Sequence, residues 1–122
     1  MSIENLTILQ KWEDMAAYAY VAVKNYPKSE RHTLAAQTVN ALLDAGAAMQ
    51  RAGLVGDRAE KKFLIEEADR CLNRMKIMIR LGVRLGFMPT KKWEILCGQL
   101  AEIGKMLGGW LKQSSGRGKG YD

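Results

Sequence analysis

Basic side chains in the second half of the chain form the pattern with the clearest chemical meaning. Lys76, Arg80 and Arg84 recur every four residues, and this spacing places them on one face of an α-helix. Arginine presents paired N–H donors that match phosphate and carboxylate oxygens, and lysine adds a compact positive charge. The spacing therefore predicts a cationic stripe that binds a polyanion. The alternative is a solvated face, or one whose arginines pair across a subunit boundary with Glu66, Glu67 or Asp69.

The positive charge of the 122-residue chain is concentrated toward its C-terminus. Residues 1–73 contain nine basic and ten acidic side chains, a net charge of −1, whereas residues 74–122 contain ten and three, a net charge of +7. This asymmetry indicates a polyanionic partner, which is a nucleic acid, an acidic protein or an acidic membrane surface. A surface that serves only solubility is the alternative. Charge and placement add further candidate phosphate contacts, which are Lys91, Lys92, Arg117 and Lys119.

The segment that carries the stripe has more apolar surface than one helical bundle can bury. At about 100° per residue, Leu72, Met75 and Ile79 share one face that would line a core. A second apolar strip lies nearly opposite and consists of Ile77, Leu81 and Leu85. A helix that is apolar on two faces is either fully buried or shared between subunits. We therefore expect self-association through this strip, and the alternative is a set of scattered exposed apolar residues, which are common.

Residue types needed for catalysis or metal binding are scarce. The single histidine, His32, and the two cysteines, Cys71 and Cys97, do not form a convincing zinc site, and no P-loop, GxSxG or HExxH sequence occurs. We expect no catalytic residue, no cofactor and two packed thiols. Contacts to nucleic acid should be mainly to phosphates, and so tolerant of sequence and sensitive to salt. Single-strand binding through stacking of bases on exposed aromatics is disfavoured, because aromatics are few and apolar faces carry Trp12, Trp93 and Trp110.

Helical periodicity interrupted at three places predicts an all-α, antiparallel, up-down-up-down four-helix bundle. The breaks lie at Pro27, at Gly53 with Gly56, and at Pro89. In the first helix, the expected buried stripe is Leu6, Leu9, Trp12, Ala16, Ala17 and Tyr20. The expected N-caps of the later helices are Ser29, Asp57 (with Glu60 in a capping box) and Thr90. The expected helices span Ile3–Asn25, Glu30–Ala52, Asp57–Gly86 and Thr90–Gln113.

The bundle is expected to occupy residues 1–113 and to be followed by a flexible basic tail, residues 114–122. No stretch approaches the roughly 18 uninterrupted apolar residues of a membrane span. The first residues are acidic where a signal peptide would be basic and then apolar, so we expect a cytoplasmic protein.

Three segments of this chain resemble a bacterial four-helix superfamily. Residues 26–31 (YPKSER), followed by Leu34 and Gln37, resemble its junction between the first two helices. This superfamily includes proteins encoded in intervening sequences of ribosomal RNA genes, and the accessory variability determinant (Avd) of diversity-generating retroelements. Residues 103–111 (IGKMLGGWL) before a basic tail, and the arginine-rich helix from Arg74 to Leu85, are more similar to Avd.

The resemblance to Avd implies a non-catalytic four-helix bundle that assembles into pentameric, positively charged rings. Such proteins associate with the element's reverse transcriptase and bind nucleic acid, either template RNA or cDNA, in support of mutagenic retrohoming. The residues that match the family's basic third helix are Arg74, Arg80 and Arg84. The N-terminal part departs from a basic character, so the sequence does not show which face meets the polymerase.

Two alternatives to the Avd interpretation remain open. One is an rRNA intervening-sequence-type interaction protein that binds RNA or an acidic protein partner. The other is a cofactor-dependent helical enzyme, against which the lack of paired carboxylate and histidine ligands argues.

Overall fold

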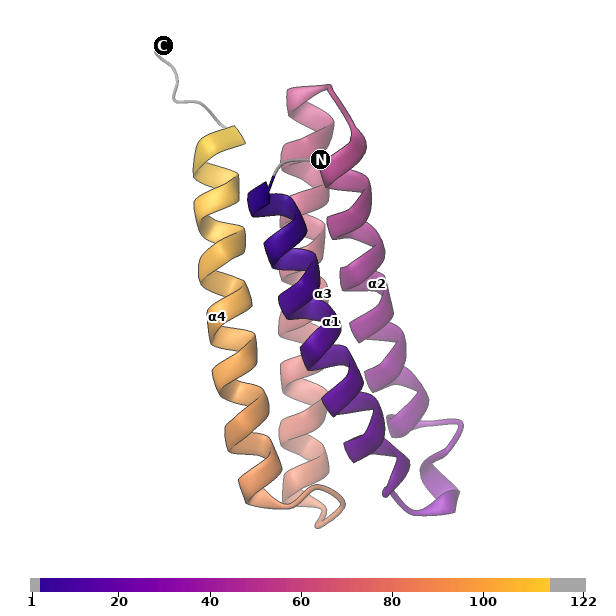
Figure 1. Ribbon diagram of the computed structural model, residues 1–122. Helices are drawn as coiled ribbons and strands as arrows, with labels where there is room; N and C mark the ends of the chain where they lie inside the picture. The colour runs from indigo at the N-terminus through magenta and orange to yellow at the C-terminus, as the bar shows by residue number, and fades with distance from the viewer. Residues whose placement is uncertain (1–2, 115–122) are drawn as a thin grey trace.

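The computed structural model describes residues 3–114, and these form four long α-helices and one short 3₁₀-helix. Each helix runs antiparallel to the one before it (Figure 1). The all-α bundle predicted from the periodicity is thus confirmed. The elements are α1 (Ile3–Lys24), η1 (Lys28–Glu30), α2 (Leu34–Leu54), α3 (Arg58–Arg84) and α4 (Thr90–Ser114). Residues 115–122, and with them Arg117 and Lys119 of the expected tail, lie outside the described residues.

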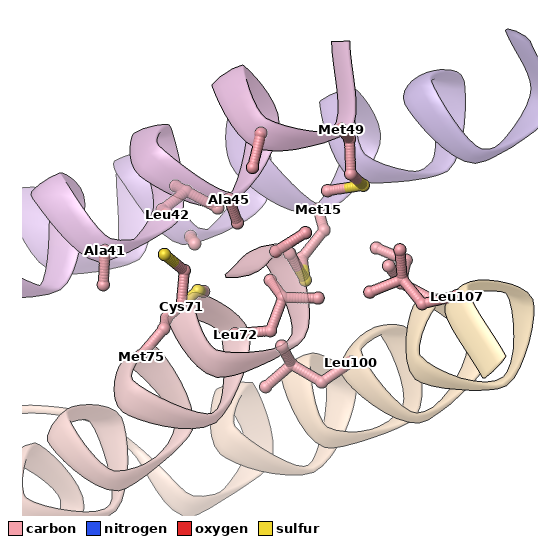
Figure 2. Packing of buried hydrophobic residues seen from close by; sticks show 14 of the residues in the cluster. Met15, Ala41, Leu42, Ala45, Met49, Cys71, Leu72, Met75, Leu100 and Leu107 are labelled. Atoms are coloured by element: carbon pink, nitrogen blue, oxygen red, sulfur yellow. The ribbon is translucent and has the colours of Figure 1, made fainter. Parts of the chain in front are cut away.

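The four helices are arranged as a closed ring around one apolar core. Helices α1 and α3 each contact both α2 and α4, so α1 and α3 lie diagonally across the bundle. Methionine and leucine side chains from all four helices meet on the axis, among them Met15, Met49, Met75 and Leu107, which are each at most 2% exposed (Figure 2). The core positions predicted for the third helix, which are Leu72, Met75 and Ile79, are buried, as expected.

The buried face of α1 differs from the predicted stripe. Leu6 and Tyr20 are each 51% exposed, and the buried positions include Ile8, Met15 and Ala22 instead. Because the helix is rich in alanine, it offers two overlapping apolar arcs, and periodicity alone does not choose between them. Packing makes the choice, because the contact of Trp12 with α2 places this residue, the bulkiest of α1, at the edge of the buried arc.

Trp12 joins α1 to α2 at a position where α2 has no side chain. Its indole Nε1–H donates a hydrogen bond to the Leu42 carbonyl oxygen over 3.0 Å. A methyl group built on Gly46 would overlap the indole ring, so the ring lies directly on the α2 backbone. The absence of a side chain at Gly46 therefore permits close approach of α1 to α2.

The connection between α1 and α2 is longer than predicted. Ser29 is not an N-cap, because residues 28–30 form a 3₁₀ turn in which the Glu30 N–H donates to the Pro27 carbonyl oxygen over 2.8 Å. Helix α2 therefore begins only at Leu34. Its other end also differs, since α2 continues through Gly53 to Leu54 and ends with Val55 in extended conformation.

Both ends of α3 are closed by local hydrogen bonds. The Asp57 carboxylate accepts a bond from the Glu60 N–H over 2.8 Å, which confirms the predicted N-cap. At the other end Gly86 has a φ of +82°, in the left-handed region that favours glycine. The Phe87 N–H donates to the Gly82 carbonyl oxygen over 2.8 Å and the Gly86 N–H to that of Val83 over 3.0 Å, which is the Schellman pattern. This turn directs the chain into α4.

Candidate nucleic-acid interface and subunit contact

The cationic stripe of α3 lies on the outside of the bundle. Lys76, Arg80 and Arg84 are all exposed. Within residues 3–114 neither arginine pairs with a carboxylate, so their guanidinium groups are open to an external anion. Arg84 occupies the last turn of α3, where the negative end of the helix dipole favours a cation. The exposure of these residues thus agrees with the predicted stripe.

Arg74 does not belong to the same stripe. It lies six positions before Arg80, which is about 120° around the helix axis. Its guanidinium Nη2 forms an ion pair with the Asp44 carboxylate of α2 over 3.1 Å. The charge of Arg74 is therefore already paired in a contact between α2 and α3, which makes Arg74 a weaker candidate for phosphate binding than Arg80 or Arg84.

Lys91 and Lys92 lie at the start of α4, at the same end of the bundle as Arg84 (Figure 1). Lys91 is exposed and Lys92 is half-buried. The first turn of α4 contains no acidic residue, although the positive end of the helix dipole disfavours lysine there. Their placement is therefore not explained by the stability of α4.

Three further cations reach this end of the molecule from the near-neutral N-terminal half of the sequence, namely Lys24, Lys28 and Arg31. They lie at the end of α1 and in the connection to α2, which shares an end with the α3–α4 connection (Figure 1). We call the surface formed by residues 24–33 and 80–94 the basic end. It holds seven basic and two acidic side chains, a net charge of +5.

The opposite end of the bundle is electrically balanced. Residues 51–67, which form the α2–α3 connection and its flanks, hold four basic and four acidic side chains. One of the basic residues there, Arg51, pairs with Glu60 over 3.5 Å. The up-down-up-down order could have revealed this polarity, because alternate connections of such a bundle lie at the same end. A count of charge along the sequence does not show this polarity, because residues 24–33 and 80–94 are far apart in the chain.

The second apolar strip of α3 is exposed, as its helical phase predicted. Ile77, Leu81 and Leu85 are 69%, 47% and 52% exposed. Phe63, which the sequence interpretation did not include, extends the strip toward the start of α3 and is 59% exposed. The guanidinium carbon of Arg70 lies 5.8 Å from the centroid of the Phe63 ring. We call these four side chains (Phe63, Ile77, Leu81 and Leu85) the α3 strip, and their exposure leaves them accessible for a subunit contact.

The two thiols are free and differ in environment. Cys71 is buried in the core and Cys97 is half-buried. Burial raises the pKa of the Cys71 thiol, and the nearby Glu67 carboxylate raises it further, so this thiol is a poor nucleophile. Across residues 3–114 no cluster of metal-ligating side chains occurs, and none of the helices there is long and apolar enough to cross a membrane.

The fold and surface define a class of protein: a small all-α bundle with one cationic end and an exposed apolar strip. Residues 6–114 match the bAvd-like family, and the chain belongs to that family. The suspected relationship to Avd is thereby confirmed.

Among solved structures, the chain is similar to a protein of unknown function from the S23 ribosomal protein family of Bacteroides thetaiotaomicron. The TM-score is 0.82 at 17% sequence identity, and the match covers 90% of this chain and 99% of that one. This likeness shows a shared fold. No curated protein matches the chain.

Proposed function

We propose that this chain is a non-catalytic accessory subunit of a diversity-generating retroelement. In this role it assembles with copies of itself, with a pentamer as the expected state, and binds the element's reverse transcriptase together with template RNA or cDNA. Membership of the bAvd-like family carries the proposal.

The charge distribution supports the nucleic-acid part of this role. A net charge of +5 at the basic end would be repeated by every copy in a symmetric ring. Such a ring would gather Arg80 and Arg84 of every copy into a cationic surface much larger than one subunit offers. The role proposed for the protein is therefore to hold the anionic template or product close to the polymerase.

The α3 strip supports the assembly part. Ile77, Leu81 and Leu85 are exposed at the end of α3 and Phe63 is exposed near its start, and no segment within residues 3–114 covers them. Burial against a second copy would remove this surface from water, and each large side chain would contribute about 1.5–3 kcal/mol if it were fully buried.

Co-purification with the reverse transcriptase encoded beside this gene tests the proposed function. The two proteins are co-expressed, with a tag on the polymerase, and are washed at low and at high salt. We expect co-purification at low salt and a sedimenting species several times the 13.6 kDa subunit mass when this chain is studied alone. Recovery of no complex at low salt would count against the proposal. A gene located in an rRNA insertion, without a reverse transcriptase and repeat pair nearby, would favour the intervening-sequence-type alternative.

A further inference from the structure

A groove lies at the basic end where α1, η1 and the start of α2 meet. It has a volume of about 550 Å³. Its apolar lining residues include Val23, Pro27 and Val39. The 3₁₀ turn, which the sequence did not predict, contributes to this groove. Because of this turn α2 begins only at Leu34, and the connection that follows α1 is longer.

The rim of the groove is cationic. Lys24, Lys28 and Arg31 line it, and all three are exposed and unpaired with any carboxylate within residues 3–114. Glu30 is the only acidic residue in positions 20–40. Its carboxylate accepts a hydrogen bond from the Thr33 hydroxyl over 2.8 Å and does not line the groove. The groove is thus complementary in charge to an anion that also has an apolar part.

An aromatic ring and an amide complete the lining. Tyr20 is 51% exposed, and the Lys24 Nζ lies 6.0 Å from the centroid of its ring. Asn40 contributes a side-chain amide from α2. A nucleotide has matching features: a flat base that stacks on an aromatic ring, a base edge that bonds an amide, and a phosphate for the cations.

We propose that this groove binds one unpaired nucleotide of a single-stranded nucleic acid. The base lies in the groove against Tyr20, and the adjoining phosphates contact Lys24, Lys28 and Arg31. This inference rests on the proposed function and adds to it a base-binding site on the side of the bundle away from the α3 stripe. The expectation that base stacking is disfavoured rested on the tryptophans, and Tyr20 is a half-exposed aromatic side chain outside that set.

The position of the groove favours a nucleic-acid strand over an acidic peptide. The connection that forms it touches the α3–α4 connection, because the rings of Tyr26 and Phe87 lie 5.5 Å apart. Cations from α1, η1, α3 and α4 therefore surround two joined loops. A strand with a phosphate at every nucleotide can follow such an extended set of cations, whereas a short acidic peptide matches only the groove.

Binding of labelled oligonucleotides to the full chain tests the inference. The probes are a 20-nucleotide single-stranded RNA of mixed sequence and the corresponding RNA duplex, measured by fluorescence anisotropy at low salt. We expect Tyr20→Leu to weaken binding of the single strand by roughly tenfold, which is the effect of losing one base–aromatic stack. Binding of the duplex should be unchanged, and Tyr20→Trp should retain single-strand binding. Because Tyr20 is half-exposed, these variants should unfold at the temperature of the unmodified protein.

A charge-matched pair of double variants completes the experiment. Lys24→Gln with Arg31→Gln removes two cations from the rim, and Arg58→Gln with Lys62→Gln removes two from the opposite end. We expect only the first pair to reduce the preference for single strands over duplex. If the unmodified protein binds RNA and both Tyr20→Leu and the rim variant bind it equally well, the groove is not the binding site. That result would not contradict the proposed function. Failure of the unmodified protein to bind either RNA would contradict both the groove and the nucleic-acid part of the proposed function. Stronger rim-dependent binding of poly-glutamate than of RNA would identify the groove as an acidic-peptide site instead.

Discussion

The aromatic rings of Tyr26 and Phe87 lie 5.5 Å apart, with their planes inclined by 53°. Tyr26 ends the turn that follows α1, and Phe87 belongs to the turn that follows α3. Their contact joins the two connections of the basic end. The Tyr26 hydroxyl lies against Gly82 of α3, buried and without a hydrogen-bond partner within residues 3–114. The basic end is therefore assembled around a tyrosine whose ring stabilises it and whose hydroxyl does not.

Tyr26→Phe should increase the stability of the fold. The substitution keeps the ring contact with Phe87 and removes a buried hydroxyl that has no partner. An unsatisfied buried polar group costs about 1–3 kcal/mol, and the small void left by the oxygen offsets part of the gain. We expect the free energy of unfolding to rise by about 1 kcal/mol, measured by urea denaturation at pH 7.5. A decrease of that size would show that the hydroxyl has a partner after all.

The same variant should reduce the sensitivity of the protein to alkali. Burial raises the pKa of Tyr26 above its ordinary value of 10.0, so the unfolded chain releases this proton before the folded chain does. The folded state therefore favours the protonated form of Tyr26 more than the unfolded chain does, and stability is lost as the pH rises above 10 and the unfolded chain ionises. Denaturation at pH 8 and pH 10.5 should show a steeper loss of stability for the unmodified protein than for Tyr26→Phe. Equal slopes would indicate that Tyr26 ionises freely in the folded state.

Two sets of glycines should respond to alanine with opposite signs. An added methyl group would overlap the Trp12 ring at Gly46 and the Tyr26 hydroxyl at Gly82, whereas nothing lies within 4 Å of one at Gly98 or Gly104. We expect Gly46→Ala to destabilise the fold by about 1–3 kcal/mol. Gly104→Ala should stabilise it by about 0.5–1 kcal/mol because alanine is the better helix former. Thermal unfolding of the variants provides the comparison, and stabilisation at both sites would contradict the close approach of α1 to α2.

Removal of the α3 cations should weaken nucleic-acid binding uniformly across sequences. In Arg80→Gln with Arg84→Gln, two guanidinium groups that are unpaired within residues 3–114 are lost. The slope of log affinity against log salt should fall by about 0.7 per lost contact to a single strand. Filter binding at several salt concentrations measures this slope. The variant Arg58→Gln with Lys62→Gln has the same net charge, and an equal effect from it would mean that total charge, and not the stripe, decides binding.

Polar substitution of the α3 strip should dissociate the assembly without unfolding the subunit. Ile77 and Leu81 are 69% and 47% exposed, so replacing both with glutamine should change subunit stability by less than about 0.5 kcal/mol per site. We expect sedimentation to give the 13.6 kDa subunit for Ile77→Gln with Leu81→Gln. Leu43→Gln, at an equally exposed position of α2, should leave the assembly intact. If the unmodified protein already sediments as a single subunit, the α3 strip is not a contact.

The sequence by itself determined the helices and most of their buried faces. Proline and glycine breaks separate segments whose apolar spacing is unambiguous in α2, α3 and α4, and the Asp57 cap depends on residues only three positions apart. The exposure of Ile77, Leu81 and Leu85 followed equally from helical phase. These features are local, because each depends on spacings within one helix.

Only the tertiary structure decided which face of α1 is buried, because alanine-rich arcs overlap and the choice depends on Trp12 meeting a bare backbone at Gly46. It also paired Arg74 with Asp44, thirty positions away in the chain. Above all it placed Lys24, Lys28 and Arg31 beside the end of α3 and the start of α4. Along the sequence these cations are counted with the ten acidic residues of positions 1–73, of which only Glu30 lies in the basic end of the bundle. The basic end is therefore a property of the packing of four helices and not of any single one.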